Sequence, residues 1–326
     1  MDAQRLLAVP NVSEGRAQGR IDALARAFAG TAAAGLVQGH PQGAEHAARD
    51  REVSLLDVHA DADHHRSVFT LAGPAGALAE RVMAGARLAV GEIDVMRDAR
   101  ERGGRAGQHP HIGALDVAPI VYPEAHLRGA ACAVALVLAD RIGEELKVPV
   151  FLYGELTASA GDPGRSRAQL RRGGVVALGR RMEAREDRLT PDFGPRRLHE
   201  RAGATLVAAR PPLVAFNVQL AAPATLEDAR SVAAAIREGA EHGLPGVRAI
   251  AVLLRGEHPQ VSMNVERPFD VPLAEVLDAI RRLAPVARAE LVGLAPRAAL
   301  EGFPADVPLP GFDPARHLLE NALGSR

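Results

Sequence analysis

The chain has 326 residues, of which 47% are hydrophobic and 24% charged, a composition typical of a soluble globular protein with a large core. Its 39 Lys and Arg residues nearly balance its 40 Asp and Glu residues, so the charge does not favour a nucleic-acid or anionic-membrane surface. The single cysteine, Cys132, excludes an intramolecular disulfide and a cysteine zinc cluster.

The first half of the chain alternates strand and helix patterns. The sequence RLLAVPNV predicts a strand that ends at Pro10, and Ile21, Leu24 and Phe28 have the spacing of a helix that closes on Gly30. The sequences EVSLLDV and RSVFTLAG predict two strands joined by the polar turn HADADHH. After a loop over residues 31–50 and these strands, the expected elements are a helix over 74–93, a Gly- and Arg-rich loop, a strand over 115–122, a helix over 124–147 and a strand over 148–155.

The second half repeats this rhythm after an Arg-rich segment, residues 165–201, which reads as a connector between the halves. A helix is expected from the capping residue Thr225 to Gly243. The other expected elements are strands over 211–220, 247–254, 259–266 and 288–294 and helices over 272–284 and 312–323. Each half therefore reads strand-helix-strand-strand-helix-strand. This pattern predicts an α/β (α+β) fold of two tandem βαββαβ ferredoxin-like subdomains with facing sheets and a ligand cleft or tunnel between them.

Localisation is predicted from what the sequence lacks. The N-terminus has neither the basic start nor the apolar run of a signal peptide, and the longest apolar run, residues 130–139, is about half the length of a membrane span. We therefore expect a cytoplasmic protein with no membrane and no nucleic-acid partner.

The turn HADADHH, residues 59–65, allows two interpretations. On a strand, His59, Asp61 and Asp63 point to the same face and could bind a divalent cation together with His64. The letters Asp-His-His also occur in a manganese phosphoesterase family, but the aspartates that this family needs in its first strand are missing from LLAVPNVSEG. The alternative is a polar turn whose side chains cap backbone groups and face a cleft.

A second candidate site is the loop GQHPHIGALDV. His109 precedes Pro110, which restricts the His109 backbone to extended conformations, and Asp116 follows on a strand. An imidazole titrates near neutral pH, so His109 is suited to general-base catalysis, whereas a structural histidine is the alternative. Neither Ser nor Cys accompanies it in a nucleophile motif.

Several long motifs occur in order along the chain: VPNVSEGR, LLDVHADADHHRSVFTLAGP, HPHIGALDVAPIV, VPVFLYGE, PDFGP, GATLVAARPPLVAFNVQL and QVSMNV. Together they resemble the formiminotransferase domain family of glutamate formimidoyltransferase over almost the whole chain. The resemblance implies an N-terminal subdomain, residues 1–202, with the catalytic histidine loop, and a C-terminal subdomain, residues 203–326. Because the chain stops at Arg326, the expected enzyme is a monofunctional form without the cyclodeaminase domain.

The resemblance also implies an activity. The family transfers the formimino group of N-formimino-L-glutamate to N5 of tetrahydrofolate and releases L-glutamate and 5-formiminotetrahydrofolate. Tetrahydrofolate is then a co-substrate, no metal is expected, and the chain is expected to form a homodimer. The general base of the family corresponds to His109, the first histidine of HPHIGALD.

Other site residues follow from the same alignment. His59 stands where some family members have an acid, so His59 or Asp61 is expected to assist the base. Arg66 matches a family arginine and suits a substrate carboxylate, with a surface arginine as the alternative, and Asp116 is grouped with it as a binding residue. Asn217 and Asn264 are candidates for contacting the pterin or for holding the cleft. The expected folate-binding segment consists of Gly194, Pro195, Arg196, Arg197, Leu198, His199, Glu200, Arg201, Ala202 and Gly203.

Two departures from the family concern substrate choice. The chain carries extra residues in 35–50 and 98–106, and His111 replaces a family arginine. Three alternatives remain open from the sequence: formyl transfer to glutamate from 5-formyltetrahydrofolate, a metal-dependent hydrolase that uses His59, Asp61, Asp63 and His64, and a folate-binding protein without turnover.

Overall fold

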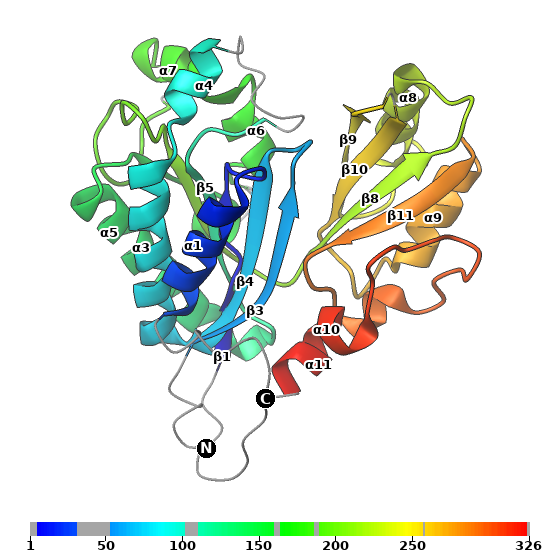
Figure 1. Cartoon of the computed structure of the whole chain (residues 1–326), viewed down its shortest axis with the longest axis horizontal. Coiled ribbons are helices and arrows are strands. Elements are labelled where there is room, and N and C mark those ends of the chain that lie inside the picture. Colours follow the sequence, from blue (N-terminus) through cyan, green and yellow to red (C-terminus); the bar gives the residue numbers. More distant parts are fainter. Residues whose placement is uncertain are drawn as a thin grey trace. The chain divides into compact units, whose positions relative to one another are not determined.

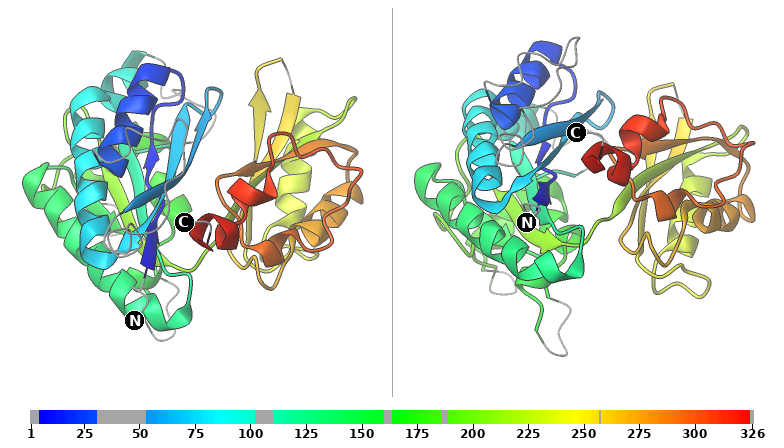
Figure 2. Two further views of the ribbon diagram at one scale, coloured as in Figure 1. Left: turned by 60° about the horizontal axis from the view of Figure 1, so that its bottom comes forward. Right: turned by 90° about the horizontal axis from the view of Figure 1, so that it is seen from below.

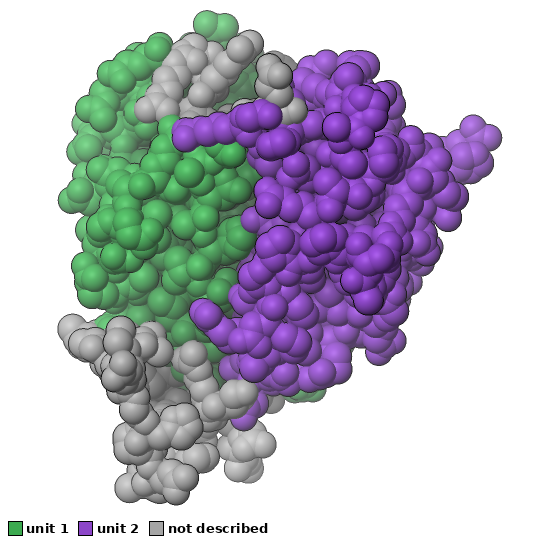
Figure 3. Space-filling model, turned by 45° about the vertical axis from the view of Figure 1, so that its right-hand side comes forward, with its two compact units in different colours: residues 1–211 green, residues 212–326 purple. Residues whose placement is uncertain are grey.

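The computed structural model describes residues 5–30, 53–101, 110–159, 164–185, 189–256 and 258–324. The chain forms two compact units, Met1–Pro211 and Pro212–Arg326 (Figure 3). The sequence placed the subdomain boundary earlier, between residues 202 and 203. The difference arises because the strand Thr205–Arg210 pairs with strands of the first unit.

The first unit carries a seven-stranded mixed sheet. Its strands are β1 (Arg5–Ala8), β2 (Asn11–Val12), β3 (Ser54–Asp61), β4 (Arg66–Pro74), β5 (Leu115–Val121), β6 (Val150–Leu152) and β7 (Thr205–Arg210). Its helices are α1 (Gln18–Ala29), α3 (Ala75–Glu92), α4 (Val95–Glu101), α5 (Arg128–Glu145), α6 (Arg167–Arg171) and α7 (Gly174–Glu183), with short 3-10 turns η2 (Ala125–Leu127) and η3 (Gly154–Leu156).

The order of the strands explains how the unit is built. β3, β4, the β1–β2 pair and β5 are antiparallel neighbours, which together with α1 and α3 make the predicted βαββαβ pattern. β7 then pairs in parallel with both β5 and β6. Parallel pairing needs a crossover connection, and α5 with the α6–α7 segment supplies it.

Two hydrophobic clusters cover opposite faces of this sheet. Helices α1, α3 and α5 lie on one face (Figures 1 and 2), where Phe28, Phe69 and Leu138 belong to the larger core. On the other face, α6 and α7 contribute Leu170 and Leu178 to a smaller core with strand residues of β5, β6 and β7. Polar side chains that point away from α1, α3 and α5 therefore lie on the same side of the sheet as α6.

The structure corrects three expectations in the first unit. The interpretation of residues 165–201 as a connector between the halves was wrong, because its described part holds α6 and α7 and lies within the first unit. The loop expected after α3 begins with the helix α4. A strand at β7 was not among the expected elements.

The second unit confirms its expected element order. It contains β8 (Val214–Leu220), α8 (Leu226–Ile236), β9 (Val247–Leu254), β10 (His258–Val265), α9 (Leu273–Arg281) and β11 (Val286–Val292), followed by η5 (Arg297–Leu300), α10 (Pro314–His317) and α11 (Leu319–Gly324). The antiparallel sheet has the order β11-β8-β10-β9. Thr225 caps α8 as expected and forms a capping box with Asp228, although the helix ends at Ile236 rather than near Gly243.

The predicted α+β class with two sheets is confirmed by these two units. The facing of the two sheets and the cleft between them remain predictions. Within the described ranges, no helix has the length and apolar character needed to cross a membrane.

Candidate functional site

The hairpin of β3 and β4 places several predicted site residues on one face of the first sheet. His59 is paired with Val68, and Asp61 is paired with Arg66. Directly opposed residues of an antiparallel pair share a face, and so do residues two apart on one strand. His59, Asp61 and Arg66 therefore lie on the same face of this hairpin.

The side chain of Asp61 organises the turn between these strands. Its Oδ1 accepts hydrogen bonds from the backbone N–H groups of Asp63 and His64, both at 2.7 Å. This geometry matches the capping interpretation of the polar turn. Among the described residues, no three His, Cys, Asp or Glu side chains are arranged to hold a metal ion.

Asp116 owes its position to a β-bulge in β5. In the pairing of β2 with β5, Asn11 lies opposite Val117 and the next residue, Val12, lies opposite Leu115. Asp116 is therefore an extra residue of β5 that has no opposite residue in β2. Leu115 belongs to the large core, whereas Val117 belongs to the small core on the opposite face. Bulges re-aim side chains in this way, and they are frequent next to active sites.

Asp116 joins two arginines in a buried ionic cluster, which we name the arginine–aspartate cluster (Arg66, Asp116 and Arg171). Arg66 donates to Asp116 Oδ2 at 2.9 Å, and Arg171 donates to the same oxygen. The other oxygen, Oδ1, accepts the backbone N–H of Ile112 at 2.8 Å. Asp116 is fully buried, and the side chains of Arg66 and Arg171 retain 15% and 8% exposure.

Electrostatics keep this cluster ionised. Burial by itself would raise the pKa of Asp116, but Arg171 and Arg66 outweigh burial, so the pKa lies below its usual range. Burial and the neighbouring Arg171 lower the pKa of Arg66 to about 9, and Asp116 opposes this shift. The side chains of Asp116 and Arg66 are therefore both charged near neutral pH.

His111 is a buried neighbour of the cluster. Burial lowers the pKa of the imidazole, Asp116 opposes this shift, and Arg66, Arg171 and His65 reinforce it. His111 is therefore neutral at neutral pH. The sequence had marked this position only as a departure from the family.

We expect His111 to make the folded protein sensitive to mild acid. The pKa of His111 is lowered on folding, so the unfolded chain binds a proton near pH 6.5 that the folded chain does not bind. Stability then rises with pH in this range and is lost as the pH falls below 6.5, with a slope of up to about 1.4 kcal/mol per pH unit. Urea unfolding between about pH 7.5 and pH 5.5 should show a smaller loss of stability for His111→Gln than for the wild type.

The control for this prediction is the exposed His242. His242→Gln should keep the wild-type pH dependence. Asp116 affects stability in a separate pH range. Because its pKa is lowered on folding, the stability that Asp116 contributes is lost only as the pH falls below 3.8, the ordinary pKa of an aspartate. Equal pH dependence in wild type and His111→Gln would contradict a neutral, buried imidazole.

The loop before α1 closes the site on the side of the turn. Glu14 is buried, and its Oε1 accepts the N–H groups of Arg16 and Ala17 at 2.8 Å and 3.0 Å. A Cβ on Gly15 would lie 2.0 Å from the carbonyl oxygen of Asp61, so only glycine allows this close approach of the loop to the turn. Sequence reasoning did not select Glu14, because a lone acid before a helix is a common capping residue.

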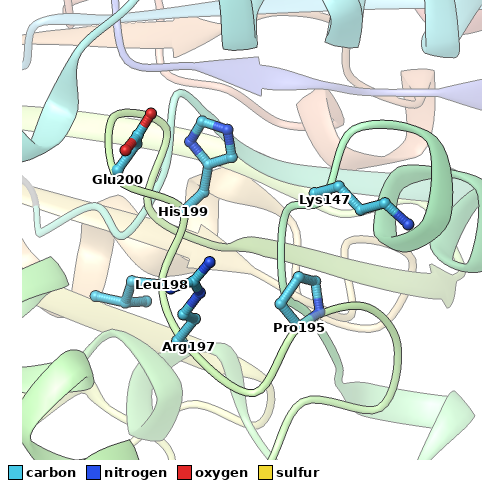
Figure 4. Close-up of a pocket in the computed structure, with 6 residues that line it drawn as sticks. All are labelled: Lys147, Pro195, Arg197, Leu198, His199 and Glu200. Atoms are coloured by element: carbon cyan, nitrogen blue, oxygen red, sulfur yellow. The ribbon is translucent and has the colours of Figure 1, made fainter.

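The expected folate-binding segment, residues 194–203, borders the same end of the sheet. Ala202 accepts the N–H of Ala114 at 2.9 Å, and His199 Nδ1 accepts the N–H groups of Arg201 and Ala202 at 3.2 Å and 3.0 Å. His199 is thus used to hold the loop. A pocket of about 300 Å³ is lined by Lys147, Pro195, Arg197, Leu198, His199 and Glu200 (Figure 4).

The charges of this pocket favour an anionic ligand. Lys147 and Arg197 contribute two cations and Glu200 one acid, and Lys147 Nζ also pairs with Glu144 Oε2 at 3.3 Å. Arg196 and Arg197 are exposed and have no acidic partner among the described residues. Folate contact by this segment remains a prediction.

Asn217 and Asn264 belong to the second unit and lie on neighbouring strands. Asn217 is paired with Ser262, two residues from Asn264 on β10, so the two amides share a face. This face is opposite to Phe216 and Val218 in the core. Asn217 Nδ2 donates to Glu290 Oε2 at 2.9 Å, so part of its amide is already used.

The structure thus brings together some of the expected site residues and adds others. His59, Asp61, Arg66 and Asp116 lie in the first unit, whereas His109 lies outside the described residues. Sequence reasoning missed Arg171. The only signal for it was the Arg- and Gly-rich composition of QLRRGG, which was attributed to a connector.

Comparisons with known proteins identify the family. The model of the formiminotransferase domain, N-terminal subdomain, matches residues 5–210. A glutamate formimidoyltransferase of Streptococcus pyogenes serotype M1 is 34% identical over 97% of this chain and 97% of its own length. A glutamate formimidoyltransferase of Thermoplasma acidophilum is 32% identical over 90% of this chain and 88% of its own.

A longer relative matches as well. The formimidoyltransferase-cyclodeaminase of Gallus gallus is 35% identical over 90% of this chain and 50% of its own length. A family model that covers most of the first unit and relatives aligned along both units lead to one conclusion: the chain belongs to the formiminotransferase family.

Proposed function

We propose that the protein transfers the formimino group of N-formimino-L-glutamate to N5 of tetrahydrofolate and releases L-glutamate and 5-formiminotetrahydrofolate. The observation that carries this proposal is the match to a glutamate formimidoyltransferase over 97% of both chains. Tetrahydrofolate is then a co-substrate. A cytoplasmic homodimer is part of the same proposal.

The chemistry requires one group that moves a proton between two nitrogens. N5 of tetrahydrofolate attacks the amidine carbon, and the nitrogen must lose its proton as the tetrahedral intermediate forms. The glutamate nitrogen must gain a proton as its bond to carbon breaks. We assign both transfers to the imidazole of His109, because an imidazole can both accept and donate a proton near neutral pH.

The arginine–aspartate cluster supports a substrate with carboxylate groups. Guanidinium groups bind carboxylates in a two-pronged geometry, and Arg66 uses one nitrogen for Asp116. The neighbouring His59 and Asp61 share the face of the hairpin with Arg66. We assign to one of them the support of the charge that develops at the amidine.

Formyl transfer from 5-formyltetrahydrofolate to glutamate is the second candidate. Formyl transfer would use the same folate and glutamate sites. The two candidate reactions are therefore distinguished by the one-carbon donor that the enzyme accepts. The proposal is tested by incubating the protein with tetrahydrofolate and formiminoglutamate and following 5-formiminotetrahydrofolate by its absorbance and by mass spectrometry. Formation of N-formylglutamate from 5-formyltetrahydrofolate and L-glutamate, without reaction of formiminoglutamate, would replace the leading proposal by formyl transfer.

A further inference from the structure

The two arginines of the arginine–aspartate cluster have more hydrogen-bond donors than the protein satisfies. Each guanidinium offers five N–H donors. Arg66 and Arg171 each direct one nitrogen to Asp116 Oδ2, and neither has another partner among the described residues. The carboxylate of Asp116 already accepts hydrogen bonds from one backbone N–H and two guanidinium groups, so it can accept few others.

Two buried polar atoms in this neighbourhood have no partner at all among the described residues. They are Nε of Arg171 and the hydroxyl group of Tyr153. Arg171 is 7% exposed, as is Tyr153, and the electrostatic interaction between them contributes to the pKa of Arg171. Leaving a buried polar atom without a hydrogen bond destabilises the fold, so two such atoms in one place point to a ligand that is bound there in function.

The local charge specifies the kind of ligand. Arg167 lies close enough to lower the pKa values of both Arg66 and Arg171, and its side chain has no acidic partner among the described residues. Three guanidinium groups are thus near one another with the single carboxylate of Asp116, which contacts two of them, beside the neutral His111. An anion with several acceptor oxygens would satisfy both the charge and the free donors.

The chain holds Arg171 in a defined position. A capping box between Ser166 and Gln169 begins α6, and Arg171 is its last residue. Gly173 and Gly174 follow with φ values of 78° and 73°, which only glycine adopts readily. A Cβ on Gly174 would lie 3.7 Å from the carbonyl oxygen of His111, so this turn runs close to the segment that leads into β5.

We propose that Arg171 binds a carboxylate of the donor substrate together with Arg66, and that Asp116 is the positioning residue that holds the two guanidiniums side by side. This inference rests on the proposed function and adds a specificity-determining residue to it. The carboxylate belongs to a glutamate moiety, which both the donor and the folate tail contain.

The connectivity favours the donor as the source. Ile112, whose N–H donates to Asp116, follows the proposed base His109 by three residues in the chain. The α-carboxylate of formiminoglutamate is one carbon from the reacting nitrogen. The glutamate of folate is separated from N5 by the aminobenzoyl group, so a carboxylate near the base belongs to the donor.

The test uses Arg171→Lys, which keeps the charge but loses the planar donor fork. We expect its KM for formiminoglutamate to rise about 10- to 100-fold, the effect of losing a charged hydrogen-bonded contact. The KM for tetrahydrofolate should change less than about 2-fold. Arg180→Lys, at an exposed arginine of α7, is the matched control and should keep both values.

A binding measurement separates this inference from the proposed activity. Calorimetric titration with L-glutamate should show weaker binding to Arg171→Lys than to the wild type by the same factor, whether or not formiminoglutamate is turned over. If the wild type turns over and Arg171→Lys keeps its KM for formiminoglutamate, the inference fails while the function stands. A raised KM for tetrahydrofolate but not for tetrahydropteroate, which lacks glutamate, would overturn the donor assignment in favour of the folate tail. A fall in melting temperature with unchanged glutamate affinity would reduce Arg171 to a structural residue.

Discussion

Replacing His109 by alanine is expected to lower kcat for formimino transfer by about 10²- to 10⁴-fold, the usual contribution of a positioned acid–base group. The affinity for tetrahydrofolate should stay within about 2-fold, because the imidazole acts on the proton of N5 rather than on the pterin or the glutamate tail. Single-turnover kinetics with saturating substrates, combined with a folate titration, separate these two quantities.

Three controls make the result specific to His109. His242→Ala removes an exposed imidazole of the second unit and should leave kcat unchanged. Added imidazole should restore part of the activity of His109→Ala, since the missing group is a proton carrier. The wild-type kcat should decline below the pKa of the base, and this decline should disappear in His109→Ala. Full activity of His109→Ala would move the proton transfers to another residue.

The repetitive strand and helix pattern made much of the fold predictable. The helical spacing of Ile21, Leu24 and Phe28 follows directly from burying one face of the helix. β7 was missed because its residues are buried on both faces, as is usual for a strand with parallel neighbours, and so show no alternation. The structure of residues 165–201 was missed because Gly and Arg occur in connectors as well as in short helices.

The arginine–aspartate cluster shows where the sequence lacks the necessary information. Strict alternation from Ala118 and Ile120 would place Asp116 in the aliphatic core beneath α3 and α5. The bulge in β5 changes this, and its position depends on the register between β2 and β5. Arg66 and Asp116 are separated by 50 residues and Arg171 by a further 55, so only the tertiary fold brings them together.

The second large effect is expected from Asp116→Asn. This change leaves Arg66 and Arg171 buried beside each other without a counter-charge, although the amide oxygen can still accept the N–H of Ile112. Removing one partner of a buried ionic group costs about 3–5 kcal/mol, and we expect this loss in the unfolding of the first unit. Circular dichroism during urea unfolding measures it, because the chain has no tryptophan.

A matched substitution and a double mutant show whether the loss comes from repulsion between the arginines. Asp140→Asn, on the exposed side of α5, should change stability by less than about 0.5 kcal/mol. Adding Arg171→Met to Asp116→Asn should restore part of the loss, with a coupling of about 0.5–3 kcal/mol. Equal stability of Asp116→Asn and Asp140→Asn would mean that the cluster does not stabilise the first unit.

The same variant connects stability with the substrate. If the two guanidiniums hold a carboxylate, L-glutamate supplies the charge that Asp116→Asn has lost, and it should stabilise this variant. Ligand at about 100 times its dissociation constant contributes about 2.7 kcal/mol, which is close to the expected cost of the substitution. Glutarate should act similarly, whereas glutamine, with one carboxylate fewer, should act more weakly. Because stabilisation by ligand does not depend on turnover, this comparison tests the charge balance of Asp116 with Arg66 and Arg171 directly.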